Sequence, residues 1–382
     1  MTFVLNSLRL PLRRAADFSR RDPVLCTAAL AAVLSAFWVP PSADYLGYLD
    51  WRVLCLLLSL MLVVAGLKSA GVFDAVTGRL LHAAHDTRAL AAALTGLSYF
   101  ASMLITNDVA LITFVPLAIL TLTRAGRPHL LIPVITLQTV AANLGSMFTP
   151  LGNPQNLYLY SYYHLSVGQF LGIMLPPTVL SLAGLCVCLL LIRPEPLTVT
   201  QTKPRRAVKP TQALPWAGLF IVCLLAVLRV IPYLAALVLV VAGVLLMDHS
   251  LLRRADYGLL LTFVFLFILT GNLQSVPAIR DRLSAMVSGR EVAVGVLLSQ
   301  IISNVPAAML LSRFTTNGPA LLVGVNVGGL GTLIASMASV ISYKLYLSAD
   351  GANPRRYLVV FTAVNLAFLA VLCVGVMLLP PA

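Results

Sequence analysis

Long apolar runs dominate the pattern of hydrophobic and polar positions along this chain. A helix needs about 20 mostly apolar residues to cross about 30 Å of hydrocarbon, and charged residues close each run here. Nine predicted spans result, at residues 24–39, 51–67, 130–160, 171–192, 216–231, 233–247, 257–272, 320–343 and 357–379. The pattern therefore predicts an all-α polytopic membrane protein.

Two further apolar stretches are each interrupted near the middle by polar residues. Residues 89–123 contain Thr106-Asn107-Asp108, and residues 291–316 contain Ser303-Asn304. Non-helical backbone at membrane depth is tolerated only where it is buried in protein or lines a cavity. We therefore predict that both stretches are re-entrant helical hairpins whose tips end inside the membrane.

The distribution of basic residues sets the predicted orientation. With the N-terminus inside and both hairpins returning to their own side, the inner loops hold 20 of the 26 Lys and Arg residues. The outer side keeps Arg52, Arg229, Arg280, Arg282, Arg290 and Arg313. This bias obeys the positive-inside rule and would be lost if either hairpin crossed fully. We expect a multi-pass protein of the cell inner membrane with a cytoplasmic N-terminus.

The two halves of the chain share a pattern of small and polar residues at a constant offset of 183. The matching positions are Asn143-Leu144-Gly145-Ser146, Thr149, Asn153 and Asn156 in the first half, and Asn326-Val327-Gly328-Gly329, Thr332, Ser336 and Ser339 in the second. The first hairpin opens inward and the second outward, which is the arrangement of an inverted repeat.

The repeat divides the chain into four predicted parts. A cytoplasmic segment (1–23) precedes the first repeat (24–192), and a basic linker with one connecting span (193–232) leads to the second repeat (233–382). Each repeat contains a hairpin and a broken helix, the latter at 130–160 and 320–343. Small residues also let membrane helices pack closely, but Pro150, Gly152 and Pro154 in one helix favour a true break.

A broken helix at mid-membrane exposes free backbone amides at one end and free carbonyls at the other. Amides attract anions, and carbonyls hold cations. Side-chain amides and hydroxyls add uncharged ligands for a small hydrophilic solute. The residues of this kind are Asn107, Asn143, Ser146, Thr149, Asn153, Asn156, Ser303, Asn304, Asn326, Thr332 and Ser336.

Asp108 is the one acidic residue that the predicted spans place at membrane depth. A carboxylate there costs about 2.5 to 3.5 kcal/mol on insertion scales, which favours a functional role. It can bind sodium together with neighbouring carbonyls, or it can carry a proton. The alternative is that Asp108 caps a helix beginning at Val109. The two roles are compatible.

Composition narrows the function further. Hydrophobic residues make up 59% of the chain and charged residues 10%, so the net charge of +13 is explained by inner loops rather than by nucleic-acid binding. The spans contain no Ser/His dyad, His-rich metal motif or pair of acids, so no enzyme and no cofactor is expected. Tyr158, Tyr160, Tyr162 and Tyr163 are expected to form an aromatic belt at the membrane interface.

Four stretches resemble the ion transporter superfamily, which includes divalent-anion/sodium symporters, citrate and arsenite permeases and a sodium/proton antiporter family. They are TNDVALITFVPLAI (106–119), AANLGSMFTPLGNPQN (141–156), SNVPAAML (303–310) and GVNVGGLGTLIASMAS (324–339). The chain is most similar to the short bacterial anion permeases of this superfamily. The resemblance implies two inverted repeats, a scaffold domain, a mobile transport domain, elevator-type movement and a homodimer.

The same resemblance assigns roles to individual positions. It implies substrate binding by Asn107, Thr149, Asn153, Asn304, Thr332 and Ser336. It implies ion coupling by Thr106, Asn107, Asp108, Gly145, Ser146, Ser303, Asn304, Gly328 and Ala335, with a sodium ion at Asn107, Asp108 and Gly145. Where the symporters have Thr after each tip Asn, this chain has Asp108 and Val305, so dicarboxylate specificity does not carry over.

These observations predict a secondary active transporter that moves a small inorganic or organic anion across the lipid bilayer. Sodium or protons would drive it through Asp108 and the hairpin tips. One alternative is a sodium/proton or other cation antiporter of the same fold, with no organic substrate. A channel or an intramembrane enzyme is the alternative from another class.

Overall fold

The structure is a computed structural model that describes residues 23–73, 84–197 and 210–379. All regular elements in these ranges are helical, apart from one isolated β-bridge between Asp86 and Pro196. Six of the described helices are long and apolar enough to cross a bilayer. The prediction of an all-α polytopic membrane protein is confirmed.

The first repeat and the connecting helix contain ten helical elements within the described ranges. They are α2 (Pro23–Ser35), α3 (Tyr45–Tyr48), α4 (Trp51–Ser69), α6 (Thr87–Ala101), α7 (Asn107–Arg124), η1 (Pro128–Leu130), α8 (Leu131–Ser146), α9 (Pro154–Tyr162), α10 (Val167–Leu190) and the connecting α11 (Pro210–Val227).

The second repeat also contains a hairpin, a broken helix and a long final helix. Its elements are α12 (Tyr233–Met247), η2 (His249–Arg254), α13 (Tyr257–Ser275), α14 (Pro277–Val287), α15 (Glu291–Ile302), α16 (Asn304–Ser312), α17 (Gly318–Val327), η3 (Leu333–Ala335), α18 (Met337–Leu347) and α19 (Pro354–Leu378). The sequence analysis did not predict α14, a polar helix bent by 109° from α15.

Both predicted hairpins and both predicted breaks are present. The first hairpin is α6 and α7 with a five-residue tip, and the second is α15 and α16 with Ser303 alone between them. The first broken helix stops at Ser146 and restarts at Pro154, where Asn153 caps the new helix. The second stops at Val327, and Gly331 (φ 107°) provides the left-handed turn in its break.

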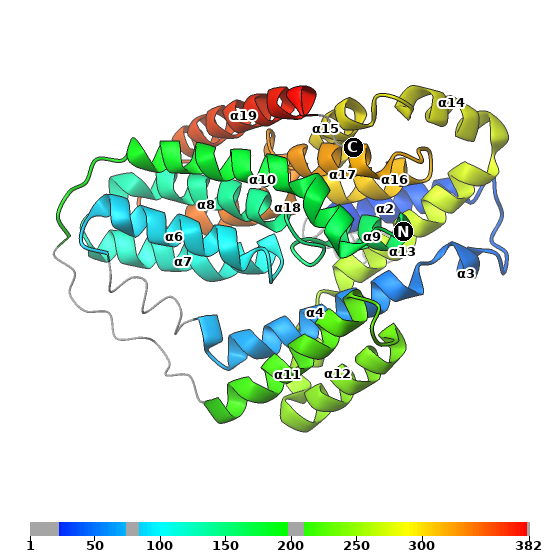
Figure 1. Cartoon of the computed structure of the whole chain (residues 1–382), viewed down its shortest axis with the longest axis horizontal. Coiled ribbons are helices and arrows are strands. Elements are labelled where there is room, and N and C mark those ends of the chain that lie inside the picture. The colour runs from blue at the N-terminus through cyan, green and yellow to red at the C-terminus, as the bar shows by residue number, and fades with distance from the viewer. Residues whose placement is uncertain (1–22, 74–83, 198–209, 380–382) are drawn as a thin grey trace, which may run out of the picture.

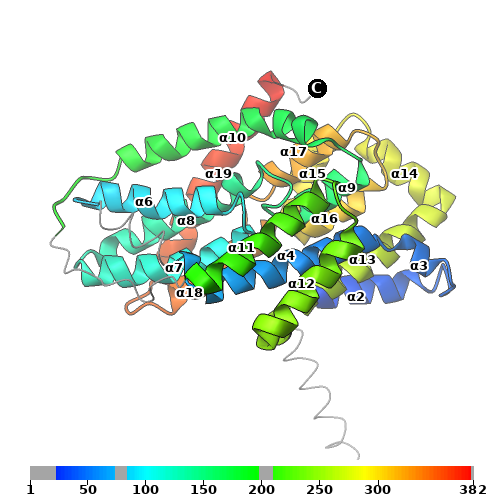
Figure 2. The same ribbon diagram turned by 60° about the horizontal axis from the view of Figure 1, so that its bottom comes forward.

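Contacts between helices follow the inverted repeat. The hairpin helix α6 packs on α8 as α15 packs on α17, and α7 packs on α18 as α16 packs on α9. Likewise, α4 packs on α12 as α13 packs on α2. Helices α4, α11 and α12 pack on one another. Figure 1 shows them below the stack of α6, α7, α8 and α10, and Figure 2 shows the same helices turned towards the viewer.

We call α2, α4, α11, α12 and α13 the lateral group, and α6–α10 with α15–α19 the hairpin group. Close contacts between the groups are made by α4 with α9 and by α13 with α16. The repeat-related pairs, α13 with α18 and α4 with α7, make no comparably close contact in the described part of the chain. The closest contacts between the groups are therefore those of α4 with α9 and of α13 with α16. Near the end of α4, Val64 still shares an apolar cluster with Leu97 of α6 and Phe114 of α7.

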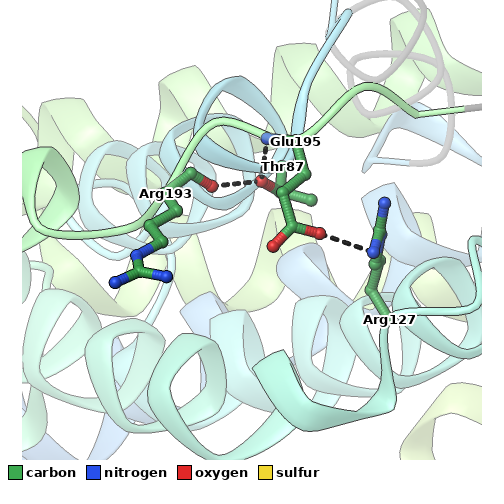
Figure 3. A network of polar contacts seen from close by, with 4 residues as sticks. All are labelled: Thr87, Arg127, Arg193 and Glu195. Atoms are coloured by element: carbon green, nitrogen blue, oxygen red, sulfur yellow. Dashed lines mark hydrogen bonds and ion pairs between the residues drawn. The ribbon is translucent and has the colours of Figure 1, made fainter.

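A polar network ties the chain after α10 to the hairpin group (Figure 3). The Thr87 hydroxyl donates to the Arg193 carbonyl over 2.6 Å and accepts from the Glu195 amide over 3.0 Å. Arg127 forms an ion pair with Glu195 over 2.5 Å. Because both side chains are about one-third exposed, the ion pair itself adds little stability. Together with the hydrogen bond from the Leu197 amide to the His85 carbonyl, the network holds the chain after α10 against the start of α6.

Candidate functional site

Asn143, one turn before the end of α8, connects one hairpin tip to the opposite broken helix. Its Oδ1 accepts from Asn107 Nδ2 over 3.0 Å and from the Ser336 hydroxyl over 2.9 Å. All three side chains are buried. The Asn143 side-chain amide therefore joins the first tip, the first broken helix and the second break. Buried networks of this kind fix one geometry when every polar atom in them has a hydrogen-bond partner.

A second set of amides joins the two broken helices directly. Asn153 Nδ2 donates to Asn326 Oδ1 over 3.1 Å, and Asn326 Nδ2 donates to Asn156 Oδ1 over 2.7 Å. Asn156 Nδ2 also lies within hydrogen-bonding distance of the carbonyls of Ser146, Met147 and Thr149. The last carbonyls of a helix have no partner within it, so Asn156 supplies donors to the broken end of α8.

Gln300 does the same for the second break, a role the sequence analysis missed. Its Nε2 donates to the carbonyls of Gly328 and Leu330 over 2.8 and 2.9 Å, and its Oε1 accepts from the Thr332 amide over 2.9 Å. The neighbouring tip residue Ser303 has φ 74° and donates to the Ala335 carbonyl over 3.4 Å. The position of Gln300, three residues before Ser303-Asn304, was the sequence signal that could have revealed this role.

Two of the residues predicted to couple ions, Gly145 and Gly328, lie where a hairpin crosses a broken helix. A methyl group on Gly145 would lie 2.1 Å from the Tyr99 carbonyl oxygen, and one on Gly328 would lie 2.9 Å from the Ser299 hydroxyl. These glycines therefore let the helices approach closely. Their proposed part in ion coupling stays a prediction.

Gly145→Ala is expected to lower the free energy of unfolding by about 1 to 3 kcal/mol or more, because the backbone of α6 would have to move. The measurement is thermal unfolding in detergent. Gly96→Ala on α6 is the control, since a methyl group there meets no atom within 4 Å. Equal melting temperatures for the two variants would contradict this packing.

The tips and breaks line one cavity of about 530 Å³. Seven predicted site residues line it: Thr106, Asn107, Asp108, Asn153, Ser303, Asn304 and Ser336. Six others do not line it: Gly145, Ser146, Thr149, Gly328, Thr332 and Ala335. Thr149 donates to the Met103 carbonyl, and Thr332 is exposed beside Gln300. The sequence did not single out Gln155, which also lines the cavity.

Asp108 lies in the first turn of α7, because the helix begins at Asn107 rather than at Val109. The hypothesis that Asp108 is the cap is therefore wrong, because Thr106 holds the cap position. The Asp108 amide donates to Asn107 Oδ1 over 3.0 Å. Its Oδ1 is buried and has no hydrogen-bond partner among the described residues. A helix amino end favours negative charge. The free oxygen is thus available to a cation or a proton.

A cation at this site would be held mainly by neutral oxygens. The described residues contain no cluster of three or more His, Cys, Asp and Glu side chains that could hold a metal ion. Asn107, Ser303 and Asn304 share the cavity wall with Asp108. One carboxylate with amide and hydroxyl oxygens suits a hard monovalent ion better than a transition metal.

Two of the four tyrosines expected to form an interfacial belt are buried inside the protein. Tyr158 and Tyr160 are only 1% and 3% exposed. The Tyr158 hydroxyl lies 2.7 Å from the Ser312 hydroxyl, and the Tyr160 carbonyl accepts from Arg229 over 3.3 Å. For Tyr158 and Tyr160 the expectation is wrong, because α16 and the loop after α11 pack against α9. The sequence alone did not place these elements there.

Comparison with known proteins decides the family. The profile of the citrate transporter family, CitMHS, matches residues 17–338. The chain belongs to this citrate transporter family. It is therefore a transporter, and its resemblance to the ion transporter superfamily is confirmed.

Individual proteins agree with this assignment. The chain is 33% identical to the inner membrane protein YbiR of Escherichia coli, over 86% of this chain and 87% of that one. It is 31% identical to the uncharacterized transporter MJ0456 of Methanocaldococcus jannaschii, over 85% and 88%. The YdaH transporter of Alcanivorax borkumensis has a similar fold, with a TM-score of 0.56, 13% identity and coverage of 89% and 88%.

Proposed function

We propose that this protein is a secondary active transporter that carries a small anion or oxyanion across the inner membrane, coupled to sodium or protons. The N-terminus would be cytoplasmic. The lateral group would act as the scaffold, and the hairpin group would carry the site across the membrane in an elevator-type movement. A homodimer is expected from the resemblance to the superfamily.

One observation carries the proposal. The tips of two hairpins, predicted to enter from opposite sides, meet the breaks of two helices around a single cavity. Asp108 has a carboxylate oxygen there without a hydrogen-bond partner among the described residues. Broken helices, mid-membrane ligands and inverted repeats are the usual parts of a binding site that opens alternately to each side. A driving ion needs a group that gains from binding it, and Asp108 is such a group.

The asymmetry between the groups supports one direction of opening. The cavity also reaches Val24, Lys68, Arg254 and Asp256, which lie at the ends of helices predicted to face the cytoplasm. At the opposite, predicted outer end, Arg229 donates to the Tyr160 carbonyl and Arg313 to Gln274 Oε1, and both contacts join the two groups. We infer an inward-open arrangement, with the outer side closed.

The alternative is a cation/proton antiporter of the same fold. It is favoured by the lack of any Lys or Arg among the tip and break residues that line the cavity, where Asp108 carries the only charge. Such a protein would exchange two cations at Asp108 and need no organic substrate.

Flux into proteoliposomes separates the two. Under an imposed sodium or proton gradient, uphill uptake of citrate, arsenite, sulfate or phosphate is expected for one of these anions. A cation-driven pH change with no anion present would support the antiporter instead. Flux that does not saturate and cannot be driven uphill would indicate a channel.

Asn107→Ala and Asn304→Ala are each expected to weaken the apparent substrate affinity by about tenfold. Each substitution removes one hydrogen bond to the substrate, which contributes about 1.5 kcal/mol. Uptake kinetics for the transported anion give the apparent KM. Asn353→Ala is the control, because Asn353 caps α19 away from the cavity. Unchanged affinity in both tip variants would place the substrate elsewhere.

A further inference from the structure

The charged residues around the cavity are unevenly placed. Its deep end has Asp108, and no basic side chain lines the tips and breaks. Two basic residues line the cavity elsewhere: Lys68 in the last turn of α4 and Arg254 at the end of η2. Both are exposed at the predicted cytoplasmic end. An anion moving between the cytoplasm and the site must therefore pass them.

Asp256 also lines this end of the cavity and opposes them. However, its Oδ1 accepts from the Leu259 amide over 3.0 Å as the cap of α13. The positive amino end of that helix offsets part of its charge. Arg254 makes neither of the two ion pairs found among the described residues, Arg127–Glu195 and Arg280–Asp281. The potential at the mouth is therefore expected to be positive.

Apolar residues also line the cavity: Leu57, Leu60 and Val64 of α4, and Val109 and Ile112 of α7. Apolar walls exclude water, so they focus the field of charges placed at the opening. Charge selection at the mouth thus affects every ion that enters.

We propose that Lys68 and Arg254 select for anions at the cytoplasmic mouth, so that charge specificity is set there and not by the residues at the tips. Asp256 acts in the opposite direction and limits this selection. The inference rests on the proposed transport function and orientation, and it adds specificity-determining residues to that site. It applies to inorganic and organic anions alike, because only charge is sensed.

The test uses a reporter thiol and needs no knowledge of the substrate. Ile112→Cys places the thiol on the cavity wall one turn from Asp108, in a background where the six free cysteines are replaced. Anionic and cationic methanethiosulfonate reagents are added from the cytoplasmic face, and the ratio of their modification rates is measured. Arg254→Gln or Lys68→Gln should lower the anion-to-cation ratio about fivefold, and Asp256→Asn should raise it.

Arg253→Gln is the matched control, because Arg253 is the exposed neighbour of Arg254 and does not line the cavity. It should change the ratio less than twofold. Raising the salt concentration to about 1 M, where the screening length is about 3 Å, should reduce the differences between variants.

Three outcomes would overturn the proposal. The first is that the anion-to-cation ratio of modification rates stays unchanged in Arg254→Gln and Lys68→Gln. The second is that this ratio falls equally in Arg253→Gln. The third is that the thiol at position 112 cannot be modified from the cytoplasmic face. Failure of the proposed transport function is a different result. In that case the wild-type protein drives no solute flux, while the ratio of modification rates still falls in Arg254→Gln and Lys68→Gln.

Discussion

Asp108→Asn should reduce ion-driven uphill uptake by about a hundredfold or more while leaving the fold intact. Asn has nearly the same shape, and the first turn of α7 still donates its amides, but Asn can neither bind a proton nor carry the negative charge that attracts a cation. The Asp108 Oδ1 has no partner among the described residues, so the substitution breaks no hydrogen bond of this atom. Uptake into proteoliposomes with an imposed gradient measures the effect.

Asp86→Asn provides the matched control on the same hairpin. Asp86 caps α6 by accepting from the Ala89 amide over 2.7 Å, and Asn caps helices equally well. This variant should keep most of the uphill uptake. Uphill uptake by Asp108→Asn equal to that of the wild type would remove Asp108 from the coupling mechanism.

The double variant Arg229→Ala, Arg313→Ala should move the equilibrium towards the outward-open state by about tenfold. Both side chains join the hairpin group to the lateral group at the predicted outer end. Arg229 donates to the Tyr160 carbonyl and lies 5.2 Å from the centre of its ring. Arg313 donates to Gln274 Oε1 and to the Tyr48 carbonyl over 3.3 and 3.2 Å.

These contacts stabilise the outer closure, so their loss should favour the alternative state. Each contact contributes about 0.5 to 1.5 kcal/mol, so the loss of both is expected to shift the equilibrium between the two states by about tenfold. Spin labels at the exposed residues Leu190 on α10 and Leu246 on α12 report the distance between the groups. The minor population of distances should grow about tenfold.

Arg52→Ala is the matched control for this prediction. Arg52 donates to the Ala226 carbonyl over 3.0 Å, but both residues belong to the lateral group. It should leave the distance distribution unchanged. The same shift in Arg52→Ala, or no shift in the double variant, would show that the outer contacts do not control the equilibrium.

Much of the fold could be predicted from the sequence because its signals are local. Polar interruptions at Thr106-Asn107-Asp108 and Ser303-Asn304 marked both tips, and Pro150 and Pro154 marked the first break. The offset between Asn143 and Asn326 revealed the repeat. These features follow from backbone chemistry in lipid, where every break must be buried or line a cavity.

The rest depends on which elements become neighbours. Gln300 binds the second break, and Arg229 binds Tyr160, across separations that no local pattern encodes. For the same reason, sequence spacing did not distinguish Asn153, which lines the cavity, from Thr149, which does not line it and donates to the Met103 carbonyl. Helix α14 was missed because its polar sequence carries no membrane-spanning signal.

The central claim is that two tips from opposite sides share one cavity that opens alternately to each face. The most direct measurement is the reactivity of single thiols at Thr106→Cys and Val305→Cys, two cavity-lining positions, towards an impermeant reagent added from each face. The account predicts that both thiols react from the cytoplasmic face, and that both become reactive from the outer face when the Arg229 and Arg313 contacts are removed. Reaction of one thiol only from inside and the other only from outside would contradict it.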